Sequence, residues 1–188
     1  MIKIGITGSL ASGKTTASKI LSHKRGPLFS ADNIVNNLYQ NKNFKFLLSK
    51  KLKIKNNNRI KKSLKNKILE NKENIKKLEK IIHPLVRDKM KRFTKQYKDK
   101  KFLFYEIPLL IESKLMKYFN VIIFIKTNKK LRQKRFVSKK GDKKLFNLLN
   151  SKQMKDKKKI KFCDYVVVNE KNINILKKNL SAIIKEYE

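Results

Sequence analysis

Cysteine is almost absent from this 188-residue chain, and long apolar runs are missing altogether. With Cys163 as the only cysteine, neither an intramolecular disulfide nor a zinc site built on several cysteines can form, which favours a reducing cytosol. No apolar run approaches the roughly 18 residues that a membrane span needs. A core strand is expected to begin at Ile2, which leaves no room for a signal peptide. We therefore expect a cytoplasmic protein with no membrane partner.

Acidic residues and arginines are also scarce, whereas lysine is abundant. The chain has 14 acidic and 50 basic residues, for a formal net charge of +36, but only six of the basic residues are arginine. Such a charge attracts anions in general and would suit nucleic acid. Nucleic-acid sites, however, usually gather arginines and stacking aromatics on one face, and here the lysines are spread among many asparagines. We interpret the excess as a compositional bias and expect no specific nucleic-acid partner.

One short segment carries the strongest functional signal. Residues 8–15, Gly-Ser-Leu-Ala-Ser-Gly-Lys-Thr, fit the phosphate-loop pattern, between a strand expected over 2–6 and a helix expected over 16–21. The glycines let backbone N–H groups approach phosphate oxygens, and the helix directs its positive dipole end at the same anion. Lys14 can reach the β- and γ-phosphates, and the Thr15 hydroxyl can bind Mg²⁺. The segment predicts nucleotide binding.

Further apolar runs alternate with segments of helical character. Strands are expected at 102–105, 121–125 and 165–168, with a weaker one at 26–30. Strands that are apolar on both faces are typical of a parallel sheet covered by helices on both sides. The alternation therefore predicts a doubly wound α/β fold, in which ligands bind at the carboxyl ends of the strands.

The middle of the chain, residues 33–101, has no convincing strand. Near-helical spacing of apolar residues from Ile60 to Met90 predicts a helical insertion, and the asparagine-rich stretch from Lys50 to Lys62 predicts an exposed loop. Pro84 is expected to open a new helix, since proline fits a first helical turn. The basic segment 138–160 has few apolar anchors, and we expect a mobile cover over the phosphates.

Two carboxylates follow expected strands and are candidates for chemistry. Asp32 lies 18 residues after Lys14 and could orient or deprotonate an attacking hydroxyl, but it would serve equally well as a helix N-cap. Glu106 follows the strand at 102–105, where phosphate-loop enzymes hold Mg²⁺ or its waters; a surface acid is the alternative. Glu112 is expected to lie outside the site.

Two arginines and one histidine are weaker candidates. Arg132 and Arg135 follow the strand at 121–125, and the planar guanidinium suits phosphate oxygens, although a solvated helix face is the default for each. His83 could respond to pH, but a lone histidine is more often structural.

In their order along the chain, the motifs resemble those of the dephospho-coenzyme A kinase family over essentially the full length. The His-Pro and Pro-Leu-Leu segments are much more specific than the phosphate loop. The matching segments are the loop with its preceding strand, Ser30-Ala31-Asp32-Asn33-Ile34, Leu78 to Arg87, Pro108-Leu109-Leu110-Ile111-Glu112, and Asp164 to Asn169.

The resemblance implies an enzyme that uses ATP and Mg²⁺ to phosphorylate the ribose 3′-hydroxyl of dephospho-coenzyme A, the final step of coenzyme A biosynthesis. It also implies a phosphate-loop NTPase-type parallel sheet flanked by helices, with a helical insertion and a lid as in nucleoside monophosphate kinases. The nucleotide-binding core is expected at 1–32, 102–137 and 161–188, the acceptor-binding domain at 33–101 and the lid at 138–160.

The expected site residues fall into four sets. Catalysis is assigned to Asp32 as the base, with Lys14 and Arg135 on the phosphates. Mg²⁺ is assigned to Thr15 and Glu106. Contacts with dephospho-coenzyme A are assigned to Asp32, His83, Arg87, Glu106 and Pro108. Contacts with ATP are assigned to Ser9, Leu10, Ala11, Ser12, Gly13, Lys14, Thr15, Thr16 and, by the wall against adenine, Asn169.

The chain departs from the family pattern at several positions. Ser9 and Ala11 stand where glycine is usual, and Ser30 stands where aspartate is frequent. Lys139 stands where the lid usually has an arginine, which keeps the charge but loses the bidentate fork. The stretch 53–62 matches poorly, so acceptor contacts there stay open.

Two other functions remain as alternatives. One is another small-molecule or nucleoside kinase of the same architecture, against which the His-Pro and Pro-Leu-Leu motifs speak. The other, less favoured, is a basic nucleic-acid-binding ATPase. We expect a monomer or a weak homo-oligomer.

Overall fold

The fold was analysed in a computed structural model, which describes residues 1–55, 60–71, 73–139 and 141–188. The chain divides into two compact units. One contains Met1–Ser30 and Tyr97–Glu188, and the other contains Ala31–Gln96.

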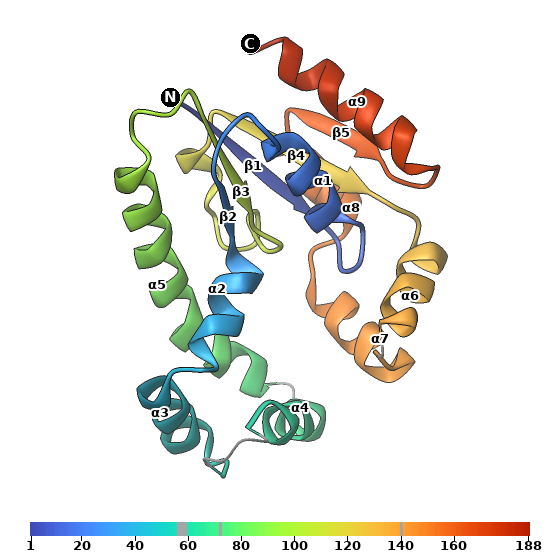
Figure 1. The fold of residues 1–188 in the computed structure, drawn as a ribbon. Coiled ribbons are helices and arrows are strands. Elements are labelled where there is room, and N and C mark those ends of the chain that lie inside the picture. Colours follow the sequence, from blue (N-terminus) through green and yellow to red (C-terminus); the bar gives the residue numbers. More distant parts are fainter. Residues whose placement is uncertain (56–59, 72, 140) are drawn as a thin grey trace. The chain divides into compact units, whose positions relative to one another are not determined.

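The first unit is built on a five-stranded sheet in which every pairing is parallel. The strand order is β2-β3-β1-β4-β5 (Figure 1). The strands are β1 (Ile2–Gly8), β2 (Leu28–Ser30), β3 (Phe102–Glu106), β4 (Val121–Lys126) and β5 (Tyr165–Val168). The α/β fold with a helix-flanked parallel sheet that the sequence predicts is confirmed.

Both faces of the central strands β1, β3 and β4 are buried, which explains their nearly continuous apolar runs, whereas Val166 and Val168 of the edge strand β5 are exposed. On one face, Ile4 and Ile6 of β1 share an apolar cluster with Leu21 of α1 (Lys14–Ser22) and Leu180 of α9 (Ile173–Lys185). On the other face, the segment between β3 and β4 contributes the buried residues Leu110, Ile111 and Leu115. Its Phe119 ring lies 5.3 Å from that of Tyr105 on β3.

The topology marks one end of the sheet for ligand binding. The central strand β1 lies between β3 and β4. The chain leaves β1 towards the β2–β3 side and later returns to the other side as β4. At such a switch point the loops at the carboxyl ends of the strands diverge and leave a crevice. The phosphate loop follows β1 at this point.

Among the described residues between β4 and β5, the chain forms three helices. They are α6 (Lys129–Ser138), α7 (Lys143–Lys152) and α8 (Asp156–Ile160). The Asn128 side chain accepts a hydrogen bond from Leu131 N at the start of α6, and Asp142 accepts one from Leu145 N at the start of α7. Segment 138–160 also has a firm apolar anchor: Phe146 is fully buried against Phe136, with ring centroids 5.6 Å apart. The mobility of the segment stays a prediction.

The described residues of the second unit form helices joined by short turns and no strand, as the sequence predicts for this region. It consists of α2 (Ala31–Leu38), α3 (Lys42–Leu52), α4 (Ile60–Glu70) and α5 (Glu73–Gln96), with α5 packed on the other three. Their shared apolar cluster is formed by Tyr39, Phe44, Leu48, Leu52, Ile60, Leu64 and Ile82.

Two local predictions for this unit are wrong. Pro84 does not open a helix but lies inside α5, because packing along the 24-residue helix, including buried Ile82 and Met90, offsets the hydrogen bond that proline removes. The stretch from Lys50 to Lys62 is not all exposed loop. Its ends belong to α3 and α4, where Leu52 and Ile60 are buried, and its positions 56–59 lie outside the described residues.

Candidate functional site

The phosphate loop turns sharply between β1 and α1. Gly8, Ala11 and Gly13 have positive φ angles of 152°, 60° and 93°. A side chain at Gly13 would be strained by this φ, and its Cβ would also lie 2.2 Å from Nδ2 of Asn169. Glycine is therefore required at this turn, from which α1 presents its N-terminal N–H groups to an anion.

The inner half of the loop, which we define as Ser12–Thr15, is held by residues that follow β4 and β5. The Ser12 carbonyl accepts hydrogen bonds from Oγ1 of Thr127 at 3.0 Å and from Nδ2 of Asn169 at 2.9 Å. Nη1 of Arg135, in the last turn of α6, lies 3.5 Å from the same oxygen. Thr127 and Asn169 are buried, so these contacts fix the inner half to the sheet.

A buried carboxylate on the neighbouring strand also contacts the inner half. Glu106, the last residue of β3, is 1% exposed and accepts a hydrogen bond from Oγ1 of Thr15 at 2.5 Å. Its other oxygen accepts one from Oγ of Ser18 at 3.3 Å. The structure thus brings the two expected Mg²⁺ ligands together, and both offer the hard oxygen atoms that Mg²⁺ prefers.

Lys14 joins the two halves of the loop. Its side chain is buried, and Nζ donates a hydrogen bond to the Ser9 carbonyl at 2.9 Å. The ammonium group therefore lies over the loop itself, where an anion bound to the backbone N–H groups would meet it.

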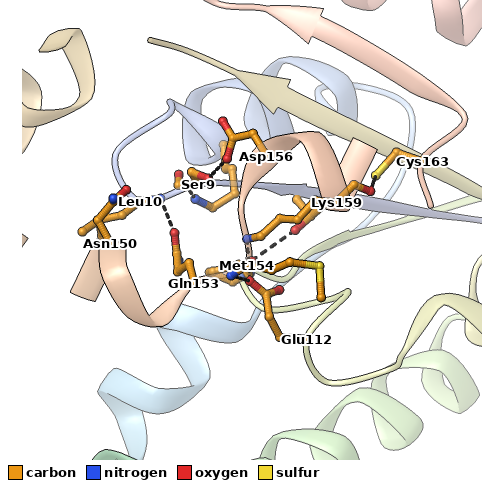
Figure 2. A network of polar contacts seen from close by, with 12 residues as sticks. Ser9, Leu10, Glu112, Asn150, Gln153, Met154, Asp156, Lys159 and Cys163 are labelled. Carbon is orange, nitrogen blue, oxygen red and sulfur yellow. Dashed lines mark hydrogen bonds and ion pairs between the residues drawn. The ribbon is translucent and has the colours of Figure 1, made fainter. Parts of the chain in front are cut away.

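The outer half of the loop, Ser9–Leu10, is held by a segment more than 140 residues later in the chain. Figure 2 shows these contacts. Leu10 N donates to Oε1 of Gln153 at 2.9 Å, and the Ser9 hydroxyl donates to Oδ1 of Asp156. The Leu10 carbonyl accepts from Nη1 of Arg132 at 3.3 Å. We call Gln153 and Asp156, with these bonds to the outer half, the clamp.

Arg132 is buried, so the solvated position that is the default for a helix arginine is wrong here. It is 6% exposed and also donates to the Thr127 carbonyl at 3.1 Å and to Oδ1 of Asn150 at 2.8 Å. Burial lowers the pKa of its guanidinium, while the Asp156 carboxylate acts in the opposite direction. Arg132 thus stabilises the loop and α7 and is held away from solvent.

Beyond the clamp, an ion pair fixes α8. Lys159 is fully buried, and its Nζ lies 2.6 Å from Oε1 of Glu112, without the geometry of a hydrogen bond. The same carboxylate oxygen accepts a hydrogen bond from Met154 N at 3.2 Å. The Cys163 thiol donates to the Lys159 carbonyl at 3.3 Å, and burial is the main reason that its pKa is raised to about 12. This thiol is therefore not a ready nucleophile.

Of the expected acceptor contacts, Glu106 and Pro108 lie in the first unit. The Pro108 carbonyl accepts a hydrogen bond from Oγ1 of Thr7 at 3.2 Å. Asp32, His83 and Arg87 belong to the helical unit, and their roles stay predictions.

Within the helical unit, these three residues have different environments. Asp32 is exposed in the first turn of α2. His83 is half-buried on α5, and desolvation is the main reason that its pKa is lowered. Arg87 is exposed, with Nε 3.4 Å from the His83 carbonyl.

Sequence reasoning missed the residues that hold the loop from outside. Thr127 could have been found, because it is a polar residue placed directly after a buried strand, as Glu106 is. Gln153 and Asp156 carry no such signal, since they lie in a polar segment among lysines.

Comparison with known proteins identifies the family. The family model described as dephospho-CoA kinase matches residues 2–174. This chain belongs to the dephospho-CoA kinase family. A dephospho-CoA kinase from Rickettsia conorii is 33% identical over 189 residues, covering 100% of this chain and 98% of the relative.

Solved structures show the same fold. The protein TT1252 from Thermus thermophilus superposes with a TM-score of 0.79 at 24% identity, covering 100% of this chain and 98% of that one. A dephospho-CoA kinase from Campylobacter jejuni gives a TM-score of 0.64 at 24% identity, with coverages of 99% and 97%. Family membership makes this chain a nucleotide-using kinase by descent. In the part of the chain that the structure describes, no helix has the length and apolar character to cross a membrane.

Proposed function

We propose that this chain transfers the γ-phosphoryl group of ATP to the ribose 3′-hydroxyl of dephospho-coenzyme A, giving coenzyme A and ADP. The observation that carries the proposal is the phosphate loop at the carboxyl end of β1, in a chain that matches the dephospho-CoA kinase family from residue 2 to 174. Phosphoryl transfer needs little covalent help from a protein. It depends on positioning and on charge stabilisation, which a loop of N–H groups and a buried lysine supply.

Two positively charged side chains are proposed to stabilise the negative charge of the transferred phosphoryl group. Lys14, at the centre of the loop, would contact the β- and γ-phosphate oxygens. Arg135 would contact the γ-phosphate from the last turn of α6, and its planar guanidinium can bind two oxygens at once. Its 3.5 Å separation from the Ser12 carbonyl is long for a hydrogen bond, which leaves the side chain available to reorient.

Mg²⁺ is proposed to bind at Thr15 and Glu106. A hydroxyl and one carboxylate suit this ion, because Mg²⁺ keeps several waters and is completed by substrate phosphates. When bound, the ion supplies positive charge to the phosphate oxygens.

Acceptor activation is proposed to fall to Asp32. A carboxylate can accept the proton of the 3′-hydroxyl or orient that hydroxyl for attack. The resemblance of Ser30-Ala31-Asp32-Asn33-Ile34 to the family motif supports this role. His83 and Arg87 are proposed as further acceptor contacts, and segment 138–160 as the lid that excludes water during transfer.

A direct assay tests this function. The protein is incubated with ATP, Mg²⁺ and dephospho-coenzyme A, and coenzyme A and ADP are quantified by mass spectrometry. We expect the two products in equal amounts, dependence on Mg²⁺, and no phosphorylated acceptor when the acceptor's 3′-hydroxyl is replaced by hydrogen. ADP release without coenzyme A, or faster transfer to another nucleoside or small alcohol in a parallel panel, would overturn the proposal.

A further inference from the structure

The phosphate loop contains a strained turn between two differently supported halves. Ala11 has a φ of 60°, in the left-handed region that non-glycine residues seldom adopt. Such conformations persist where the surrounding structure holds them. Ala11 lies between Leu10, which is bonded to Gln153 and Arg132, and Ser12, which is bonded to Thr127 and Asn169. Support on both sides of the turn therefore maintains its shape.

The inner support comes from the sheet, whereas the outer support comes from the segment expected to be the lid. Gln153 lies between α7 and α8, and Asp156 is the first residue of α8. Figure 2 shows both side chains directed at the loop, Gln153 at Leu10 and Asp156 at Ser9. Formation of the outer half is thus tied to the position of the α7–α8 connection.

The clamp residues are themselves firmly placed. Lys159, three residues after Asp156 and just under one turn further along α8, pairs with Glu112, and Met154 N donates to the same carboxylate. Breaking a buried ion pair on one side leaves an uncompensated charge, so this anchor keeps α8 in place. From the other side, Asn150 at the end of α7 binds Arg132. The clamp is therefore anchored on both sides, by Glu112 on one side and, on the other, by Arg132, which also binds the Leu10 carbonyl.

We propose that Gln153 and Asp156 are positioning residues for the phosphate loop, and that they set its affinity for the triphosphate of the nucleotide. They accept hydrogen bonds from the outer half. These bonds hold Ser9–Leu10 in the conformation that places the backbone of the whole loop around the phosphates. The inference rests on the proposed function only in taking the loop as a nucleotide site. Because the contacts come from segment 138–160, nucleotide affinity and the placement of this segment are coupled, and each stabilises the other.

The test removes each acceptor separately. Asp156→Ala removes the acceptor for the Ser9 hydroxyl, while Asp156→Asn keeps an oxygen there. Gln153→Met keeps the length of the side chain and removes the acceptor for Leu10 N. Asp99→Ala and Gln40→Met repeat the same kinds of change at exposed positions without a role in the loop. Binding of MgATP and MgADP is measured by calorimetry, alongside thermal melts and steady-state kinetics with both substrates.

We expect Asp156→Ala and Gln153→Met each to weaken MgADP and MgATP binding by about fivefold, the scale of one net hydrogen bond. The KM for ATP should rise in parallel, while kcat and the KM for the acceptor change by less than about twofold. Asp156→Asn should restore most of the affinity, and both control variants should bind as the wild type does. In a Ser9→Ala background, Asp156→Ala should have little further effect, because the two side chains act as a pair.

Three results would overturn the proposal. The first is unchanged nucleotide affinity in both acceptor-removing variants. The second is equal weakening by Asp156→Asn and Asp156→Ala, which would indicate a charge effect. The third is tighter binding in Gln153→Met, which would mean that the amide competes with phosphate for Leu10 N. Nucleotide binding needs no phosphoryl transfer, so these outcomes are independent of whether dephospho-coenzyme A is the acceptor.

Discussion

The inner and outer halves of the phosphate loop are close neighbours in sequence, but different parts of the fold hold them. Thr127, Asn169 and Glu106 hold the inner half, and all three are buried at or just beyond the ends of sheet strands. Gln153 and Asp156, from the α7–α8 region, hold the outer half. One loop can therefore combine a preorganised part with a part that depends on a neighbouring segment.

Lys14→Ala gives the largest expected effect, because Lys14 connects the two halves and is placed to stabilise charge in the transition state. We expect phosphoryl transfer to fall by about 10²-fold or more in a protein that remains folded. Steady-state kinetics with a thermal melt as the control measure this. Turnover within about threefold of the wild type would exclude the loop as the site of phosphate binding.

Asp32→Asn tests acceptor activation without changing the phosphate loop, because Asp32 belongs to neither half of that loop. The N-cap alternative for Asp32 is wrong, because α2 begins at Ala31 and Asp32 lies inside its first turn. An exposed carboxylate there contributes little to stability through the helix dipole, so we expect melting temperature and ATP affinity to stay nearly unchanged. Turnover should fall by roughly 10²-fold, the usual scale for losing a positioned base. The measurement is kcat with both substrates saturating. Full activity would leave Asp32 as an exposed acid in the first turn of α2 and direct attention to Glu106.

Thr127→Val tests the inner half with little change in the shape of the side chain. The change removes the hydroxyl that binds the Ser12 carbonyl, and Thr127→Ser keeps it. Because the site is buried, we expect about a tenfold loss in kcat/KM for ATP, larger than the effect of either clamp variant. The serine variant is the matched control. A smaller effect than that of Gln153→Met would reverse the comparison and make the outer half the more critical one.

The last comparison needs no change in activity, because the reactivity of Cys163 reports on the support of the outer half. Its thiol is bonded to the Lys159 carbonyl, and its pKa is raised from 9.0 to about 12, so little thiolate forms near neutral pH. Reaction with a disulfide reagent should be at least about tenfold slower in the native than in the urea-unfolded protein. The native rate should still rise between about pH 9 and 10, where the unfolded rate levels off. Equal native and unfolded rates would show that α8 opens readily and gives the clamp little support.

Much of the fold follows from local patterns in the sequence. The strands at 102–105 and 121–125 are visible because a parallel sheet buries both faces, so nearly every residue in them is apolar. Pro84 shows where a local rule fails: proline predicts a helix start, but packing on both sides of it sustains one continuous α5.

In the candidate site, too, some features follow from local sequence patterns and others from tertiary packing. By itself, the sequence determined the phosphate loop, because its glycines, Lys14 and Thr15 act through fixed spacing along a single turn. It also determined that Glu106 would lie at the carboxyl end of a strand. Only the tertiary structure decided what holds the loop: Thr127 and Asn169 reach it across the sheet, and Gln153 and Asp156 reach it from 143 and 147 residues away. Hydrogen bonds between such distant positions depend on how the elements pack, and a polar residue in a lysine-rich segment carries no local mark of its partner.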